Sequence, residues 1–294
     1  MSIETSSGLH PALALGDVLP ETECLTSHTH LYVSLSDLIM EHIFYHPNIE
    51  CDSQKLDEVE SSSIRAILGE VSLEDHFVAT LTQQIHNAIK PEHQAIRVCL
   101  SNADSYSFNS LIGGGLEEHE VNPALGVRGV SRYAKERFRT AFILECKVIK
   151  ALQEQGIDVQ IVVPFVRTMS DAAKVIDLLA EQGLPRGLNG LKVHYSADVP
   201  SSALLAEKLL HYFDGMVINL ENLAQFTLGI DRFNEHLEYL YDPQNETIVE
   251  LIDMASTAAA SVNKPVVITS SRLIEYPKIQ EYIVEHKLDA VVTM

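Results

Sequence analysis

The sequence is poor in cysteine and has no long uninterrupted apolar segment. Its four cysteines, Cys24, Cys51, Cys99 and Cys146, form no CxxC pair and are too sparse for a disulfide framework, which favours a reducing, cytoplasmic setting. No stretch of about 18 apolar residues is present, so we expect no membrane span. Residues 1–17 lack the basic start and apolar run of a secretory signal peptide, which also favours the cytoplasm.

Positive charge is scarce, because 21 Lys and Arg residues stand against 41 Asp and Glu residues, for a formal net charge of -20. Such a chain repels phosphate backbones and anionic membrane surfaces, so we expect neither nucleic acid nor a membrane as a partner. The same field opposes anionic small molecules unless individual arginines are concentrated in a cleft. No linker, repeat or low-complexity tract divides the 294 residues, so we predict a single domain over residues 1–294.

The second half of the sequence alternates short apolar segments with amphipathic ones. The apolar segments are rich in β-branched residues, as expected for buried parallel strands, and they cover residues 159–166, 191–195, 216–220, 265–269 and 290–293. Expected helices cover residues 135–155, 170–183 and 245–261, the second of them with Ser170 as N-cap and Gly183 after its end. This order predicts parallel strands with right-handed crossovers, and the length suits one (β/α)8 barrel that reaches its eighth strand at the C-terminus.

The first third of the sequence has a weaker pattern, and we expect residues 1–94 to be partly irregular. Residues 24–35 are the expected first strand and residues 95–101 another, with a mostly helical, acidic stretch at residues 52–90. Residues 113–115 are three glycines, which we expect to form a turn and not a phosphate-binding loop, because no strand–loop–helix frame surrounds them.

Several sequence blocks, in order and at fixed spacing, carry a family resemblance over residues 95–294. The most specific is NPALGVRGVSRYAKERFR, residues 122–139. The others are LIGG (111–114), VPFVRT (163–168), DLLAEQGLPRGLNGLKV (177–193), PSSALLAE (200–207), YFDG (212–215) and QFTLGIDR (225–232), with a looser match at residues 31–47. Together they resemble the C-terminal domain of phosphoenolpyruvate synthase. The resemblance implies a TIM barrel of the phosphoenolpyruvate/pyruvate-binding type, which exchanges a phosphoryl group between phosphohistidine and pyruvate.

The positions that carry the chemistry in that family hold other residues here. The resemblance places Ser34 and Cys99 where the family has two phosphate-binding arginines, and Ser36 at the acidic companion of the first. Thr269 stands at the cysteine that protonates the enolate, and an alkyl hydroxyl is too weak an acid for that role. Arg97 lies two residues before Cys99, so we expect it to face the barrel interior and to remain a candidate ligand-binding residue.

The magnesium site that the resemblance implies is altered as well. Asp198 stands at its glutamate, and Glu221 and Asn222 stand at its Asn-Asp pair. Mg²⁺ requires near-octahedral oxygen ligands at about 2.0–2.1 Å, whereas these replacements shorten one ligand and remove the charge of another. We therefore expect a weakened or absent metal site. The alternative is a re-formed carboxylate pair, Asp198 with Glu221, around a divalent ion such as Mg²⁺.

Four arginines remain at family positions, namely Arg128, Arg132, Arg167 and Arg186. Arg128 and Arg167 are the candidates for holding an anionic ligand. The structural alternative is that these arginines tie loops together through carboxylates.

A second metal motif is the pair His28 and His30, an HxH whose spacing on a strand can place two imidazoles on a zinc ion. His194 and Asp198 are the candidates for completing such a site. Ordinary loop or barrel histidines are the alternative.

Two functions are consistent with these observations. The first is a stand-alone, catalytically degenerate relative of the phosphoenolpyruvate synthase barrel with a binding or assembly role, which holds phosphoenolpyruvate, pyruvate or another small carboxylate weakly, or associates with itself or an active paralogue. The second is a divalent-metal-dependent enzyme that acts on a keto acid or acyl compound through Asp198 and Glu221, with Arg128 or Arg167. Full phosphotransfer is not expected, because the family's phosphohistidine and nucleotide-binding domains have no counterpart in this sequence.

Overall fold

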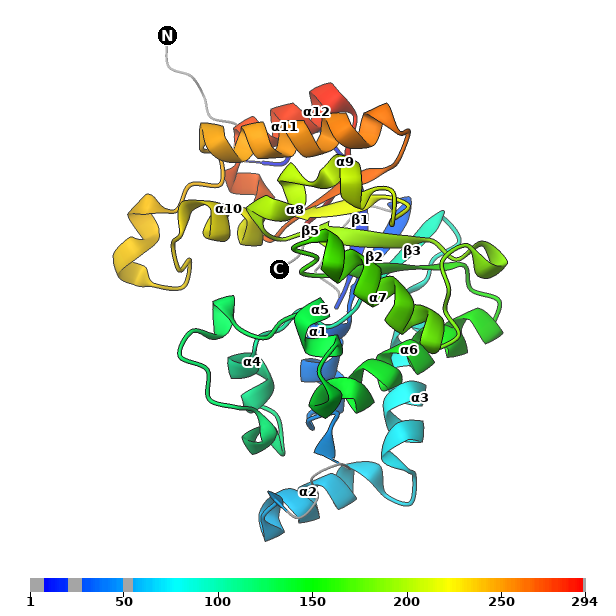
Figure 1. The fold of residues 1–294 in the computed structure, drawn as a ribbon. Helices are drawn as coiled ribbons and strands as arrows, with labels where there is room; N and C mark the ends of the chain where they lie inside the picture. Colours follow the sequence, from blue (N-terminus) through cyan, green and yellow to red (C-terminus); the bar gives the residue numbers. More distant parts are fainter. Residues whose placement is uncertain (1–7, 21–27, 50–54, 293–294) are drawn as a thin grey trace.

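A closed barrel of eight parallel strands forms the centre of the computed structural model, which describes residues 8–20, 28–49 and 55–292 (Figure 1). The strands follow one another around the barrel in sequence order, and β1 pairs with β8 to close it. They are β1 Ala14–Leu19, β2 His30–Ser34, β3 Ala95–Cys99, β4 Val159–Val163, β5 Val193–Ala197, β6 Met216–Asn219, β7 Val266–Ser270 and β8 Asp289–Val292. The predicted barrel is confirmed.

The barrel begins earlier in the sequence than we predicted. The segment that we expected as the first strand contains β2 instead, and its residues 24–27 lie outside the described part of the chain. The first strand is β1, which we did not predict because Asp17 interrupts its apolar pattern.

Asp17 is buried in β1 because three basic side chains surround its carboxylate. His28 Nδ1 lies 2.7 Å from Oδ1, while Lys90 Nζ and His93 Nε2 each lie 2.8 Å from Oδ2. Burial opposes ionisation, but the hydrogen bonds from Lys90, His93 and His28 outweigh it and lower the pKa of Asp17. The cluster joins β1 to the chain just before β2 and just before β3.

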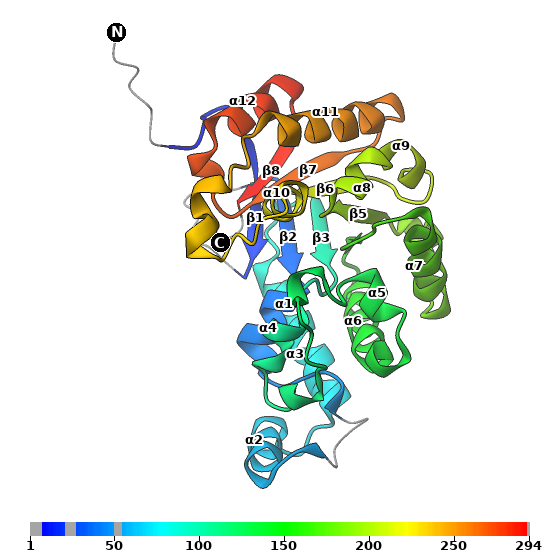
Figure 2. The ribbon, with the colours of Figure 1, turned by 60° about the vertical axis from the view of Figure 1, so that its left-hand side comes forward.

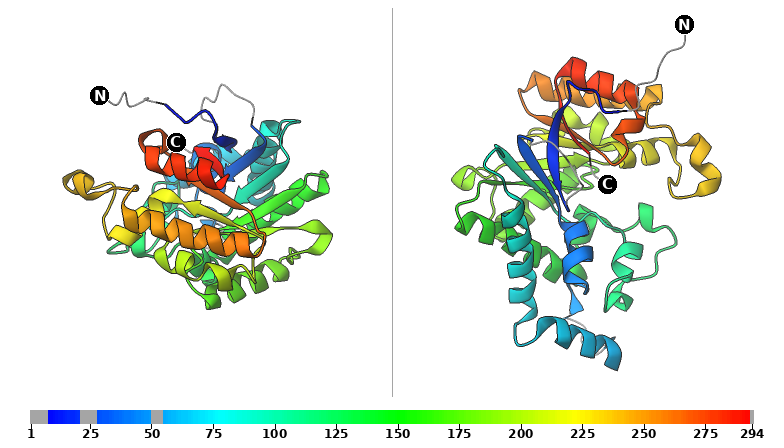
Figure 3. Two further views of the ribbon diagram at one scale, coloured as in Figure 1. Left: turned by 90° about the horizontal axis from the view of Figure 1, so that it is seen from above. Right: turned by 180° about the vertical axis from the view of Figure 1, so that it is seen from behind.

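Helices cover the outside of the barrel and also form a lobe that projects from it. The covering helices are α5 Val130–Tyr133, α6 Arg139–Glu154, α7 Met169–Glu181, α8 Pro200–Leu204, α9 Ala206–Leu209, α10 Leu220–Leu228, α11 Glu246–Ser261 and α12 Pro277–His286. The lobe contains α1 Leu35–Leu38, a π-helix at Ile39–Ile43, α2 Glu58–Leu68, α3 Leu73–Ala88 and α4 Ser105–Asn109. Figures 2 and 3 show α2 at the far end of this lobe, on the side opposite α11 and α12.

Short 3-10 helices occupy several connections, namely Gly114–Leu116, Pro123–Leu125, Glu136–Phe138, Leu188–Gly190, Glu235–Leu240 and Leu273–Glu275. The first of these is the turn that we predicted at the three glycines, and Gly113 enters it with a φ of 76°. Among the described residues, no helix is long and apolar enough to span a membrane.

The predicted helices are present with shifted ends. α7 begins at Met169, two residues earlier than an N-cap at Ser170 implies, because Thr168 is its N-cap and accepts a hydrogen bond from Asp171 N at 3.1 Å. Gly183 follows this helix with a φ of 76°, as predicted. α11 has Asn245 as its N-cap, and α6 follows a 3-10 turn at residues 136–138.

A buried ionic triad fastens the lobe to the chain that leads into α6. His46 Nε2 lies 2.7 Å from Glu117 Oε1, and both terminal nitrogens of Arg132 also donate to the Glu117 carboxylate. All three side chains are almost fully buried, and the Arg132 guanidinium lies over the rings of Phe108 and Phe138. Arg132 therefore has the structural role that we considered for the retained arginines.

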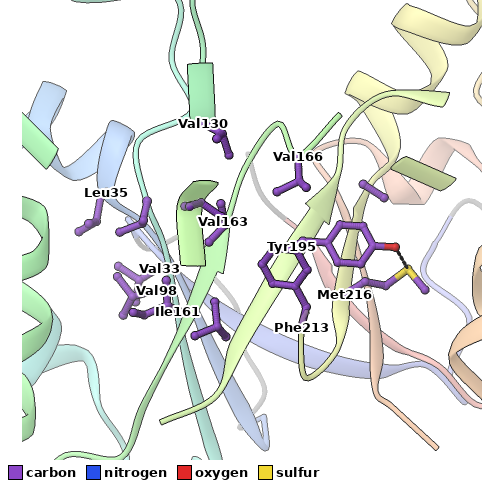
Figure 4. Close-up of a cluster of buried hydrophobic side chains, with 14 of the residues drawn as sticks. Val33, Leu35, Val98, Val130, Ile161, Val163, Val166, Tyr195, Phe213 and Met216 are labelled. Carbon is purple, nitrogen blue, oxygen red and sulfur yellow. Dashed lines mark hydrogen bonds between the residues drawn. The ribbon is translucent and has the colours of Figure 1, made fainter. Parts of the chain in front are cut away.

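Two separate hydrophobic cores hold the barrel together. The outer core lies between strands and helices, and Figure 4 shows part of it, with Val33, Val98 and Ile161 from β2, β3 and β4 and with the Tyr195 hydroxyl 3.5 Å from Met216 Sδ. Alternate strand residues point the other way, into the barrel. Seven of these form the inner apolar layer, which consists of Val18, Tyr32, Cys99, Val162, Val217, Val267 and Val291. Polar residues lie in the barrel on both sides of this layer.

Candidate functional site

A cavity of about 460 Å³, here named the mouth cavity, opens at the carboxyl ends of the strands. In barrels of this architecture, chemistry is placed at this end, because the loops that follow the strands converge there. The residues singled out from the sequence that line the mouth cavity are Ser34, Arg128, Glu221, Asn222 and Thr269. Further side chains around it are Asp37, Asn102, Arg232, Glu238, Tyr241, Arg272 and Tyr276.

Asp198 lies beneath the wall of the mouth cavity and is fully buried at the end of β5. Its Oδ1 accepts a hydrogen bond of 2.8 Å from the side-chain amide of Asn222, and its Oδ2 accepts one of 2.8 Å from the backbone N–H of Phe165. Both carboxylate oxygens are thus bonded within the protein. These bonds connect the ends of β4 and β5 to the start of α10.

Glu221 lies in the first turn of α10, because β6 ends at Asn219. The Asn219 side chain caps the helix by accepting a bond from Asn222 N at 3.0 Å. Glu221 Oε1 accepts hydrogen bonds from Ser270 Oγ at 2.6 Å and from Ser271 N at 2.9 Å. The carboxylate is therefore directed toward the end of β7, away from the bonds that hold Asp198.

The donor set at these three positions does not fit an octahedral Mg²⁺ ion. Asn222 directs an N–H toward Asp198, so the amide already satisfies the carboxylate that a cation would neutralise. Glu221 is bonded to Ser270 and Ser271. Within the described ranges, the structure contains no group of three or more His, Cys, Asp or Glu residues that could hold a metal ion.

Arg128 is the buried arginine of the mouth cavity. Its Nε donates to the carbonyl oxygen of Asn102 at 2.9 Å, and its guanidinium lies 4.2 Å from the centroid of the Phe165 ring. Burial is the main cause that lowers the pKa of Arg128, and the charges of Arg232 and Arg167 act in the same direction. Three arginines are thus close enough to interact at this end of the barrel.

Gly129 follows this arginine in the LGVRG block, and its conformation and surroundings require a glycine. Its φ of 53° and ψ of -128° belong to a region that side chains rarely tolerate. A Cβ at this position would lie 2.3 Å from the carbonyl oxygen of Pro164 and 2.8 Å from Phe165 Cβ. The close approach brings Arg128 onto the end of β4.

Arg167 and Arg232 complete the basic cluster in different ways. The NH1 group of Arg167 donates to the carbonyl oxygen of Phe165 at 3.1 Å. This bond stabilises the loop after β4. Arg232 lines the mouth cavity, and its Nε is buried without a hydrogen-bond partner among the described residues. Sequence analysis did not select Arg232, although it ends the QFTLGIDR block that carried part of the resemblance.

Ser34, Cys99 and Thr269, which replace residues that carry the chemistry in the family, have local structural roles. Ser34 caps α1 by accepting a bond from Asp37 N at 3.4 Å, and Thr269 donates to the carbonyl oxygen of Ile218 at 3.4 Å. Cys99 belongs to the inner apolar layer, and burial raises the pKa of its thiol.

The structure places Arg97 at the opposite end of the barrel from the mouth cavity. Together with His30 and His194, it lines a second cavity at the amino ends of the strands. His28 is bonded to Asp17 instead, and Asp198 lies at the carboxyl end of β5. The four residues considered for a zinc site are therefore not brought together.

A closed parallel barrel with a polar, arginine-lined cavity at its carboxyl end defines a TIM-barrel protein with a candidate anion site. The sequence profile of the family described as "PEP-utilising enzyme, PEP-binding domain" matches residues 62–292, so the chain belongs to this family. The resemblance given by the sequence blocks is thereby confirmed.

Curated relatives are phosphoenolpyruvate synthases. That of Neisseria meningitidis serogroup B is 34% identical over 262 residues, which cover 86% of this chain and 33% of the relative. The enzyme of Escherichia coli (strain K12) is 34% identical over 91% of this chain and 34% of its own length, and that of Pseudomonas aeruginosa is 41% identical over 66% and 25%. The chain thus spans about a third or less of the length of these relatives.

Solved structures with a similar fold are more distant. Macrophomate synthase has a TM-score of 0.45 at 9% identity, with 90% of this chain and 70% of that chain covered. The citrate lyase beta subunit of M. tuberculosis, complexed with oxaloacetate and magnesium, has a TM-score of 0.41 at 14% identity, with 90% and 81% covered. At these values neither structure bears on function.

Proposed function

We propose that this phosphoenolpyruvate-binding-family barrel is catalytically degenerate and that its mouth cavity binds a small carboxylate or a phosphoenolpyruvate-like anion. The observation that carries the binding role is the presence of Arg128 and Arg232 at one cavity, where no described residue offers the buried Arg232 Nε a hydrogen-bond partner. A buried guanidinium N–H that lacks a partner gains most from a ligand that supplies an oxygen acceptor, because charge-assisted hydrogen bonds are the strong ones.

Degeneracy is supported by the way in which the former ligand positions are satisfied. Asp198 is bonded to Asn222 and to Phe165 N, Glu221 is bonded to Ser270 and Ser271, and Thr269 carries a hydroxyl where the family has a thiol. A chain that has lost both the metal ligands and the acid can retain anion binding through its arginines. The role is then one of binding or of assembly with a second copy or an active paralogue, in the cytoplasmic setting that the scarcity of cysteine favours.

Calorimetric titration with phosphoenolpyruvate and with pyruvate, each with and without Mg²⁺ or Mn²⁺, tests this proposal. We expect weak binding that does not depend on the metal and that Arg128→Met weakens about tenfold or more, since one charged hydrogen-bonding partner is removed. Arg65→Met is the matched control, because Arg65 is exposed on α2. Tight metal binding that is abolished by Asp198→Asn would instead support a metal-dependent enzyme acting on a keto acid or acyl compound.

A further inference from the structure

The amino ends of the strands surround a second cavity, of about 570 Å³, here named the floor cavity. Its lining includes His30, Arg97, Gln160, Lys192, His194, Asp214, Lys264 and Asp289. The inner apolar layer lies between this cavity and the mouth cavity. In barrels this end normally serves stability, so a polar cavity of this size is unexpected there. Its volume is in the range of small-molecule sites.

Arg97 is the feature of the floor cavity that most needs a ligand. Only 6% of this residue is exposed. Its Nε and NH1 atoms are buried, yet they have no hydrogen-bond partner among the described residues. Buried charges in proteins are almost always paired, because the loss of hydration is otherwise uncompensated. The nearby carboxylate of Asp289 acts on the pKa of Arg97 only as a secondary influence, and burial lowers that pKa.

The histidines beside Arg97 do not compensate its charge. Burial lowers the pKa of His30 to about 4 and that of His194 to about 3, so both imidazoles are neutral near pH 7. Each ring occupies the space left by a glycine, since a Cβ on Gly16 would lie 2.1 Å from His30 Nε2 and one on Gly215 would lie 2.4 Å from His194 Nδ1. The rings therefore form fixed, uncharged walls beside the guanidinium.

Two other charged groups around the floor cavity, Lys264 and Asp214, are already engaged with the backbone. Lys264 Nζ donates to the carbonyl oxygen of Phe213 at 2.5 Å, and Asp214 Oδ2 accepts a bond from Val193 N at 2.9 Å. Lys192 is exposed at the rim, where it adds a positive charge. In the described part of the chain, the Arg97 Nε and NH1 groups thus remain donors without a bonded acceptor.

We propose that the floor cavity is a second binding site, in which Arg97 holds an oxyanion carried by a small molecule. A phosphate or a carboxylate group supplies the coplanar oxygen acceptors that the free Nε–H and terminal N–H groups of a guanidinium can donate to. Lys192 at the rim attracts the anion against the negative field of the whole chain. This site is distinct from the mouth cavity and does not depend on the function proposed there.

The direct test observes the Arg97 Nε–Hε resonance in ¹⁵N NMR spectra during titration with inorganic phosphate and, separately, with malonate. The resonance is assigned by its loss in Arg97→Met. We expect at least one of the two anions to shift it in a saturable way, and the two titrations show whether a phosphate or a carboxylate is preferred. A resonance that stays in place at saturating concentrations of both anions overturns the proposal.

Calorimetry with the same anions locates the site by mutation. We expect Arg97→Met to weaken binding of the effective anion about ten- to one-hundred-fold, as loss of charged hydrogen bonds implies, while Arg65→Met on α2 leaves it unchanged. Arg128→Met reports separately on the mouth cavity and should not remove binding at the floor. Wild-type affinity in Arg97→Met, or equal losses in Arg97→Met and Arg128→Met, contradicts the assignment.

Thermal unfolding separates a ligand site from a purely structural arginine. An unpartnered buried charge does not stabilise the empty protein, so Arg97→Met should unfold without anion at the wild-type temperature or above it. It should also lose the rise in unfolding temperature that the anion gives the wild-type protein. If Arg97→Met fails to fold without anion, the arginine is structural, and the NMR titration of the wild-type protein still decides whether an anion binds.

Discussion

The side-chain amide of Asn222 donates a hydrogen bond of 2.8 Å to Asp198 Oδ1, at the place where the resemblance implies a pair of acidic metal ligands. An amide facing a carboxylate is a stable neutral–ionic pair, whereas two carboxylates at the same distance repel each other and need a cation. The bond therefore allows the carboxyl ends of β5 and β6 to pack without metal.

Asn222→Asp should recreate the need for a cation. Without metal, two carboxylates in this buried position lower the free energy of unfolding by about 2–4 kcal/mol. Mg²⁺ or Mn²⁺ should restore it, which is measured as a metal-dependent rise in the unfolding temperature. Asn87→Asp is the control, since Asn87 is exposed on α3 and its Oδ1 acceptor is kept. A variant as stable as wild type and insensitive to metal would show that the two positions no longer interact.

Glu145 on α6 should make stability depend on pH near neutrality. Its Oε2 accepts a bond of 2.8 Å from Ser101 N in a fully buried position, and burial raises its pKa to about 7 from an ordinary value of 4.5. The folded protein therefore binds an extra proton between these values. The resulting stabilisation is complete below pH 4.5 and is lost as the pH rises through 7, to an extent of up to about 3 kcal/mol.

Glu145→Gln keeps an acceptor for Ser101 N and removes this titration. Urea unfolding at several pH values should show that the variant gains stability relative to wild type as the pH rises from 4.5 to 8. Glu154→Gln, an exposed substitution on the same helix, should leave the pH dependence unchanged. A constant difference between wild type and Glu145→Gln across this range would contradict the prediction.

The triad of His46, Glu117 and Arg132 should behave as one unit. Burial alone would raise the pKa of Glu117, but the hydrogen bonds from His46 and Arg132 outweigh it and lower that pKa to about 2. The stabilisation from this ionised carboxylate is therefore present above pH 4.5 and is lost as the pH falls toward 2.

Removing one partner of the triad leaves the other charge buried. Arg132→Met and Glu117→Gln should each lower the free energy of unfolding by about 3–5 kcal/mol, as found for broken buried ion pairs. The double variant should cost at least about 1 kcal/mol less than the sum of the single ones, because it leaves no uncompensated charge. Chemical denaturation of the four proteins measures this coupling, and strictly additive losses would argue against it.

Gly129→Ala should displace Arg128. The backbone conformation alone costs about 1–3 kcal/mol for an L-residue, and the clash with the Pro164 carbonyl oxygen adds to it. Gly183→Ala is the matched control, since Gly183 also has a positive φ but nothing lies within 4 Å of its added Cβ. We expect the first substitution to lower the unfolding temperature more than the second and also to weaken anion binding at the mouth cavity. Equal losses in stability would show that the close approach is unimportant.

The strands of the second half could be predicted because their apolar residues are continuous in sequence. β1 could not, because the groups that allow Asp17 to be buried come from residues 28, 90 and 93, which sequence inspection cannot place beside it. Alternation along β3 correctly predicted that Arg97 faces inward. Which end of the barrel it reaches depends on the stagger of neighbouring strands, which is a property of the closed sheet.

Part of the mouth cavity could also be found from the sequence, since Arg128 lies in the most specific block. The bond between Asp198 and Asn222 could not, because it joins residues 24 positions apart whose facing depends on where β6 ends and α10 begins. Arg232 was missed for a similar reason. It follows α10, and only the folded chain shows that its Nε is buried at the cavity.

The inner apolar layer, formed by valines with Tyr32 and Cys99, lies between the mouth cavity and the floor cavity. The two cavities that it separates have no lining residue in common. Occupants of the two ends should therefore bind independently, and their effects on the unfolding free energy should add. Catalytic residues at the mouth cavity could thus be lost in evolution without changing the binding of a ligand in the floor cavity.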